Sequence, residues 1–264
     1  MYLAGGVLTQ LKEDDGMWIN GFNKICTGGF LVLVLLLGAP GIGMSAQEAS
    51  PESGEPVVGL VFVNALTALD NVDVYINGDS SEHRVVEKLA YGKTSDELQG
   101  TATGTVVIIR QNVSWGVDRD IFNTMIPTEP GQTYVVVISD FFVIPVLLDL
   151  RKPLIGDARS IGVHAAAEAP ALDLYASESS RRIPIGNLTP LVEDLQYGAS
   201  TAGGPTRTGS FDLRVTEAGT DNVVLEQEQV EIEPNTSYVF VVMGKPESRE
   251  QPLTILSVSL PSVS

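Results

Sequence analysis

The chain has 264 residues, with 33 acidic against 16 basic side chains and a formal net charge of −17 at pH 7. This charge disfavours a nucleic-acid partner, because a phosphate polymer requires a basic surface. One cysteine and two histidines exclude a disulfide framework, a cysteine-based metal site and a three-histidine metal site. A hydrophobic content of 44% argues against intrinsic disorder.

Residues 1–46 have the features of a secretory signal peptide or a membrane anchor. An uncharged run follows Lys24, and its core, FLVLVLLL, spans residues 30–37. Small residues at Ser45 and Ala46 favour cleavage there. The alternative is an uncleaved anchor over residues 25–44, which is about the minimum length for crossing a bilayer. In both cases we expect an extracytoplasmic protein, located in the periplasm, at the cell surface or in the medium.

Three details refine the N-terminal region. Residues 1–16 contain three acidic side chains, which are unusual in a signal, so translation is expected to start at Met17. The lone Cys26 precedes the apolar core, whereas a lipoprotein cysteine follows it, so lipidation is not expected. Residues 47–56 are acidic, contain two prolines and are predicted to be a linker.

The remainder of the chain repeats itself. Six tyrosines form three pairs in matching order, separated by 100, 106 and 104 residues. The pairs are Tyr75 and Tyr175, Tyr91 and Tyr197, and Tyr134 and Tyr238. A period near 100 residues matches one small domain rather than a solenoid unit. We therefore predict domains at 57–150 and 158–264, joined by a linker at 151–157.

Both repeats have the pattern of β-strands. Apolar or alternating runs rich in β-branched residues are separated by glycine and proline turns, and beyond the signal no long window carries a helical apolar stripe. Strands are predicted at residues 58–63, 72–76, 105–110, 133–139, 143–148, 160–164, 171–175, 210–216, 223–232, 237–243 and 253–258. Residues 192–197 could form a helical turn or a strand. The fold class is therefore all-β, with two tandem immunoglobulin-like or transthyretin-like sandwiches.

Three motifs in the second repeat carry a family resemblance. The segment from Gly162 to Tyr175, GVHAAAEAPALDLY, resembles the opening of the domain-of-unknown-function family 4397, and Leu195–Gly198 and Asn235–Val241 resemble two of its later elements. The first repeat is a degenerate copy, with Asn64 in place of His164. The resemblance implies secreted or surface-bound bacterial β-sandwich modules. It carries over no catalytic residue.

Few side chains are candidates for chemistry. His164 could be a base oriented by Asp173, but a hydrogen bond from its imidazole to the turn at 168–170 is the favoured interpretation. Asp73 and Asp173 alternate with apolar neighbours. Each could point outward, cap amides of a neighbouring turn, or bind Ca²⁺ together with an acidic neighbour, Asp70 or Glu168. No calcium-loop motif is present, so no metal or cofactor is predicted. His83, in a polar loop, is expected to be solvated.

Aromatic residues offer a different kind of site. The paired tyrosines could stack on sugars, but packing on the core with a corner hydrogen bond is favoured. Trp115 lies in a Ser-Trp-Gly insertion of the first repeat, where it could contact a partner or carbohydrate, or pack on its own sheet. The weak candidate binding residues are therefore Trp115, His164 and Asp173.

The sequence favours a non-enzymatic envelope or secreted protein with a structural, adhesive or protein-interaction role. Its expected partners are envelope proteins or glycans. The alternative is a carbohydrate-binding or small-ligand-binding protein that uses the interdomain groove or the Trp115 loop. A hydrolase is the least favoured possibility, because no catalytic motif is found. Since each repeat has its own predicted core, a charge at Val74 or Leu174 is expected to unfold only its own repeat.

Overall fold

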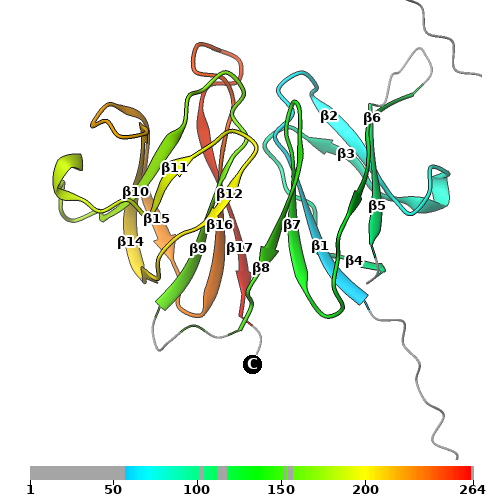
Figure 1. Ribbon diagram of the computed structural model, residues 1–264, viewed down its shortest axis with the longest axis horizontal. Coiled ribbons are helices and arrows are strands. Elements are labelled where there is room, and N and C mark those ends of the chain that lie inside the picture. Colours follow the sequence, from blue (N-terminus) through cyan, green and yellow to red (C-terminus); the bar gives the residue numbers. More distant parts are fainter. Residues whose placement is uncertain (1–56, 102–103, 112–117, 152, 154–156, 263–264) are drawn as a thin grey trace, which may run out of the picture. The chain divides into compact units, whose positions relative to one another are not determined.

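The structure is a computed structural model that describes residues 57–101, 104–111, 118–151, 153 and 157–262 (Figure 1). Within those residues the fold is all-β, as predicted. There is no α-helix in this part of the chain, and the two short 3₁₀ turns are Ser81–His83 and Ile185–Asn187. The predicted signal or anchor, Cys26 and Trp115 lie outside the described residues.

The first repeat folds into two four-stranded sheets. One has the strand order β4-β1-β7-β8 and the other has the order β3-β2-β5-β6. The strands are β1 Val57–Asn64, β2 Asn71–Ile76, β3 Arg84–Ala90, β4 Leu98–Thr101, β5 Thr105–Gln111, β6 Arg119–Ile126, β7 Thr133–Ile138 and β8 Val143–Leu148.

The second repeat has the same topology. Its sheets have the orders β12-β9-β16-β17 and β11-β10-β14-β15, and a short strand, β13, also pairs with β9. Each repeat has one parallel pair, β1 with β7 and β9 with β16. The strands are β9 Asp157–His164, β10 Leu172–Glu178, β11 Val192–Leu195, β12 Ser200–Ala202, β13 Thr206–Arg207, β14 Gly209–Glu217, β15 Val223–Ile232, β16 Thr236–Met243 and β17 Thr254–Pro261.

Three apolar cores hold the sheets together. Leu60 and Phe62 of β1 belong to a core inside the first repeat, and the second repeat has a matching core of its own. The alternate residues Val61 and Val63 belong to a third core, which also contains Val239 and Val241 of β16. Because β1, β7 and β16 are apolar on both faces, their sequences are continuous hydrophobic runs.

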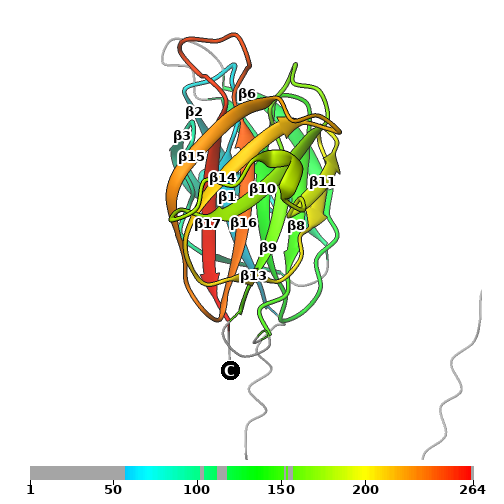
Figure 2. The ribbon, with the colours of Figure 1, turned by 90° about the vertical axis from the view of Figure 1, so that its left-hand side faces the viewer.

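The two repeats belong to one compact unit, and the third core joins them. It lies between the sheets β4-β1-β7-β8 and β12-β9-β16-β17. Figure 2 looks onto the sheet β11-β10-β14-β15, behind which the other layers lie. The sequence predicted a core for each repeat but not this shared one. The domain limits at 150 and 158 stay a prediction.

The strands that the sequence did not predict are β3, β4, β6, β12 and β13. Four of them lie at sheet edges, where one side is free of a neighbour and polar residues are tolerated. β6, for example, contains Arg119, Asp120 and Asn123. Residues 192–197 resolve into the strand β11 followed by a turn that contains Tyr197.

Candidate functional site

His164 is a buried residue that ends β9, and both of its ring nitrogens are engaged. Nδ1 accepts a hydrogen bond from the Ala166 amide at 3.2 Å, and Nε2 lies 2.9 Å from the Pro170 carbonyl oxygen. Burial lowers the pKa of His164, which favours the neutral ring that this geometry requires. The contact with Pro170 agrees with the favoured interpretation of the sequence, and it leaves no free nitrogen for a general base.

Asp73 and Asp173 are buried, although neither belongs to the apolar cores that contain their neighbours. Each Oδ1 accepts a backbone amide at 2.7 Å, from Lys88 for Asp73 and from Asp194 for Asp173. Both donors have positive φ angles near 50° and lie beside irregularities in strand register. The carboxylates therefore fix bulges in edge strands, as amide caps.

The second oxygens of these two carboxylates have different partners. Oδ2 of Asp73 faces the Arg84 guanidinium at 3.4 Å, and Oδ2 of Asp173 accepts the Gly219 amide at 2.8 Å. No group of three or more potential metal ligands occurs among the described residues. Because both oxygens of Asp173 already accept amides, the cation-ligand interpretation has no support at this position.

The repeated tyrosines are packing residues. Tyr134 and Tyr238 belong to the cores of their own repeats. The Tyr238 hydroxyl accepts the Glu233 amide at 2.9 Å, which is the predicted corner hydrogen bond. On the outer face of the first repeat, the Arg110 guanidinium lies 4.6 Å from the centre of the Tyr75 ring. In the second repeat, burial raises the pKa of Tyr175.

Tyr91 and Tyr197 lie where the two repeats meet. Tyr91 packs against the shared core, and burial raises its pKa. The Tyr197 ring makes edge contacts with His164 and with Phe142 of the first repeat, with distances between ring centres of 5.7 Å and 5.4 Å. The hydroxyls of both tyrosines are buried without a hydrogen-bond partner among the described residues.

Phe141 and Phe142 form an aromatic apex in the turn between β7 and β8. Their exposed fractions are 70% and 46%. The turn is fixed by hydrogen bonds between Ser139 and Phe142, and by Asp140, which accepts the Thr67 hydroxyl at 2.6 Å. This site was not predicted from the sequence. The signal was two consecutive large apolar residues, at a point where strand alternation has already ended.

His83 is not simply solvated. Its Nδ1 lies 3.1 Å from the Ile76 carbonyl oxygen. The ring also covers Gly78, because a Cβ at that position would lie 2.3 Å from the His83 Cδ2 atom. This histidine therefore closes the turn after β2, and the glycine leaves room for its ring.

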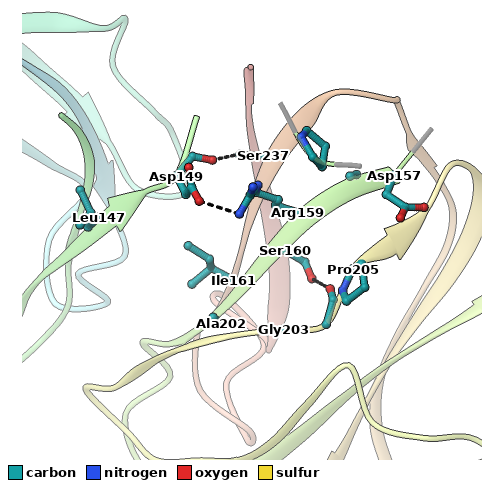
Figure 3. Close-up of a pocket in the computed structure, with 13 residues that line it drawn as sticks. Leu147, Asp149, Asp157, Arg159, Ser160, Ile161, Ala202, Gly203, Pro205 and Ser237 are labelled. Atoms are coloured by element: carbon teal, nitrogen blue, oxygen red, sulfur yellow. Dashed lines mark hydrogen bonds and ion pairs between the residues drawn. The ribbon is translucent and has the colours of Figure 1, made fainter. Parts of the chain in front are cut away.

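A groove of about 500 Å³ lies between β8 of the first repeat and β9 and β12 of the second (Figure 3). Its apolar lining residues are Leu147, Pro153, Ala158, Ile161, Ala202 and Pro205. The Ser160 hydroxyl donates to the Gly204 carbonyl at 3.2 Å and accepts from the Thr206 hydroxyl at 3.0 Å. The charged residues of the lining are Asp149, Asp157 and Arg159.

Asp149 joins the two repeats beside this groove. Its Oδ2 accepts from Arg159 Nη1 at 2.6 Å, and its carbonyl oxygen accepts from the Ser237 hydroxyl at 3.0 Å. Arg151 donates to the same carboxylate at 2.7 and 2.8 Å. Hydrogen bonding from Arg151, with the nearby Arg159 charge, lowers the pKa of Asp149 to about 2. A second cavity, of about 690 Å³, shares Leu147 and Asp149 with the groove.

No helix in the described part of the chain is long and apolar enough to span a membrane. The predicted segment at 25–44 lies outside that part.

Comparison with known proteins gives only remote similarity. No protein-family model matches the chain, and no curated protein matches it. A carbohydrate-binding module of family 26 from Eubacterium rectale Amy13K, solved with maltoheptaose, is 11% identical with a TM-score of 0.24, and the match covers 79% of this chain and 98% of that one. A putative cell adhesion protein from Parabacteroides distasonis is 8% identical with a TM-score of 0.21, over 77% and 97% of the two chains.

The Bacillus anthracis TIE protein is 10% identical with a TM-score of 0.24, over 78% of this chain. The match spans less than half of that protein, 44% of its length. Similarities this remote carry no information about what this chain binds.

Proposed function

We propose that this chain is a non-enzymatic extracytoplasmic protein that contacts another envelope or surface protein through the aromatic apex, Phe141 and Phe142. The proposal rests on the apex because both rings remain exposed although they also contact Tyr197. In the second repeat the corresponding turn, residues 244–253, has the polar sequence GKPESREQPL. Pairs of exposed aromatic side chains on a fixed turn suit the centre of a protein interface.

The position of the apex also supports this role. β1 runs from Val57 to Asn64, and Asn64 pairs with Ile138 at the end of β7. The apex therefore lies at the far end of β1 from Val57, where residues 1–56 join the fold. At that end of the fold the Phe141 and Phe142 side chains are exposed to solvent. The Phe141 and Phe142 rings lie at interplanar angles of 89° and 62° to Tyr197. Neither phenylalanine ring is coplanar with Tyr197, so these rings do not form one extended flat platform for a sugar.

Co-sedimentation of the full chain with cell envelopes of the bacterium that produces it tests the contact. We expect the wild type to sediment with envelopes and the double variant F141S/F142S to lose about tenfold in affinity. M125S is the control, because Met125 is 67% exposed on β6 and outside the apex. Protease treatment of the envelopes should abolish binding. Binding that survives protease but not removal of glycans would contradict a protein partner.

Intact mass and fractionation of the full chain test its location. A product that lacks about 45 residues, in the periplasm or the medium, indicates a cleaved signal. A full-length product in the membrane fraction indicates an anchor. A full-length product in the cytosol would contradict the extracytoplasmic proposal.

A second candidate function is the binding of a small ligand in the groove between the repeats. The observation that favours it is the apolar cavity of about 500 Å³, a volume typical of small-molecule sites. The Trp115 loop, the other place considered from the sequence, lies outside the described residues.

A further inference from the structure

We propose that the groove between β8 and β9 takes a small organic anion, with an apolar body against the groove walls and one carboxylate or sulfonate at Arg159. The inference rests on the second candidate function and names its ligand class. It does not depend on the aromatic apex.

The walls select the apolar body. Leu147 from β8 and Ile161 from β9 both line the cavity (Figure 3). The Ser160 hydroxyl is already paired within the protein, so it offers a ligand little hydrogen bonding. Transfer of apolar surface from water onto such walls is favourable, whereas a sugar would leave most of its hydroxyls unpaired there.

Arg159 selects the anionic group. It lines the groove, and its side chain is 37% exposed. Only Nη1 of Arg159 donates a hydrogen bond to Asp149. The Asp149 carboxylate also accepts hydrogen bonds from Arg151. Two guanidinium groups thus share one carboxylate, and in Figure 3 the carboxylate of Asp157 points away from Arg159. In a chain of net charge −17 this is a local site for an anion, and guanidinium is well suited to bind carboxylates.

Comparison of the repeats separates this arrangement from the requirements of the fold. Arg159 lies opposite Ser237 in the register of the parallel strands β9 and β16. The matching residues in the first repeat, on β1 and β7, are Gly59 and Thr133. The fold therefore forms with glycine at the position of Arg159. The arginine belongs to the groove of the second repeat and not to the shared topology.

Two fluorescent probes with the same aromatic body test the ligand class. Anilinonaphthalene sulfonate carries an anion, and N-phenylnaphthylamine is neutral. With the full chain we expect both to bind, the sulfonate about tenfold more tightly, as for a hydrogen bond to a charged group. R159Q should abolish that difference, and R159K should retain part of it. R182Q, which removes an arginine 83% exposed and paired with Glu226, is the matched control and should change nothing.

The cavity itself is tested by A202F, which adds a ring to its lining and should weaken both probes. The F141S/F142S variant should bind both probes normally, which separates groove binding from adsorption at the apex. Displacement of the sulfonate by decanoate indicates an aliphatic ligand body, and displacement by naphthoate an aromatic one.

The two ideas fail differently. The anion class is overturned if the sulfonate binds the wild type no more tightly than the neutral probe does, or if R159Q leaves the affinity of both probes unchanged. It is also overturned if neither acid displaces the sulfonate. In these cases the groove remains a site for neutral molecules. If neither probe binds, or if A202F weakens neither, the groove candidate itself is overturned.

Discussion

Asn64 and His164 occupy the same position in the two repeats and accept the same hydrogen bond. Asn64 Oδ1 accepts the Leu66 amide at 3.0 Å, and His164 Nδ1 accepts the Ala166 amide at 3.2 Å. Each side chain also contacts a backbone carbonyl, Leu89 for the asparagine and Pro170 for the histidine. The histidine is therefore a structural replacement for an amide side chain, and its chemistry as a base is not needed in either repeat.

Substitution of His164 should follow from this equivalence. H164A leaves the buried Ala166 amide without an acceptor, so we expect the free energy of unfolding to fall by about 2 kcal/mol. H164N can supply the acceptor as Asn64 does, and should cost less than about 1 kcal/mol. Urea denaturation at pH 7.5 measures both. Equal losses in the two variants would show that the ring contacts, and not the amide cap, are what His164 provides.

The pH dependence of stability should also trace to His164. Burial lowers its pKa in the folded state, so the unfolded chain binds more protons and stability falls as pH decreases below about 6.5. The slope should approach about 1.4 kcal/mol per pH unit. Asp149, with a pKa of about 2, contributes only below its unfolded value near pH 4. Urea midpoints at pH 7.5 and 5 should differ more for wild type than for H164N, and equal differences would contradict the assignment.

Asp173 should matter for stability and not for metal binding. D173A leaves the amides of Asp194 and Gly219 without their acceptor, so we expect a loss of about 3 kcal/mol in unfolding free energy. The exposed Asp70 supplies a matched control, and D70A should be neutral. Thermal melts with calcium and with EDTA should coincide for the wild type. A calcium-dependent shift that D173A removes would restore the cation-ligand interpretation.

The sequence predicted what the two repeats share. The tyrosine pairs located the duplication, and alternation placed Asp73 and Asp173 opposite their apolar neighbours. An interdomain groove was one of the sites considered from the sequence, but its lining could not be predicted, because it depends on how Asp149 at the end of one repeat meets Arg159 at the start of the next. The sequence also could not separate the cores. Runs such as Tyr134–Ile138 show burial on both faces but do not show what covers the second face.

The shared core changes how the repeats should unfold. The sequence alone predicts that V74K unfolds only the first repeat. In the structure, loss of that repeat would also expose Val239 and Val241 of β16, which pack against Val61 and Val63. We therefore expect V74K to destabilise both repeats, because burial of apolar surface between them is lost.

Hydrogen exchange followed by mass spectrometry at increasing urea can measure this coupling. Amides of β7 and β16 should lose protection together in V74K, at a lower urea concentration than in the wild type. Val57, which is 48% exposed at the start of β1, offers the control V57K, which should leave both strands protected. If β16 stays protected after β7 has exchanged, the second repeat is stable without the shared core, and the independent unfolding predicted from the sequence holds.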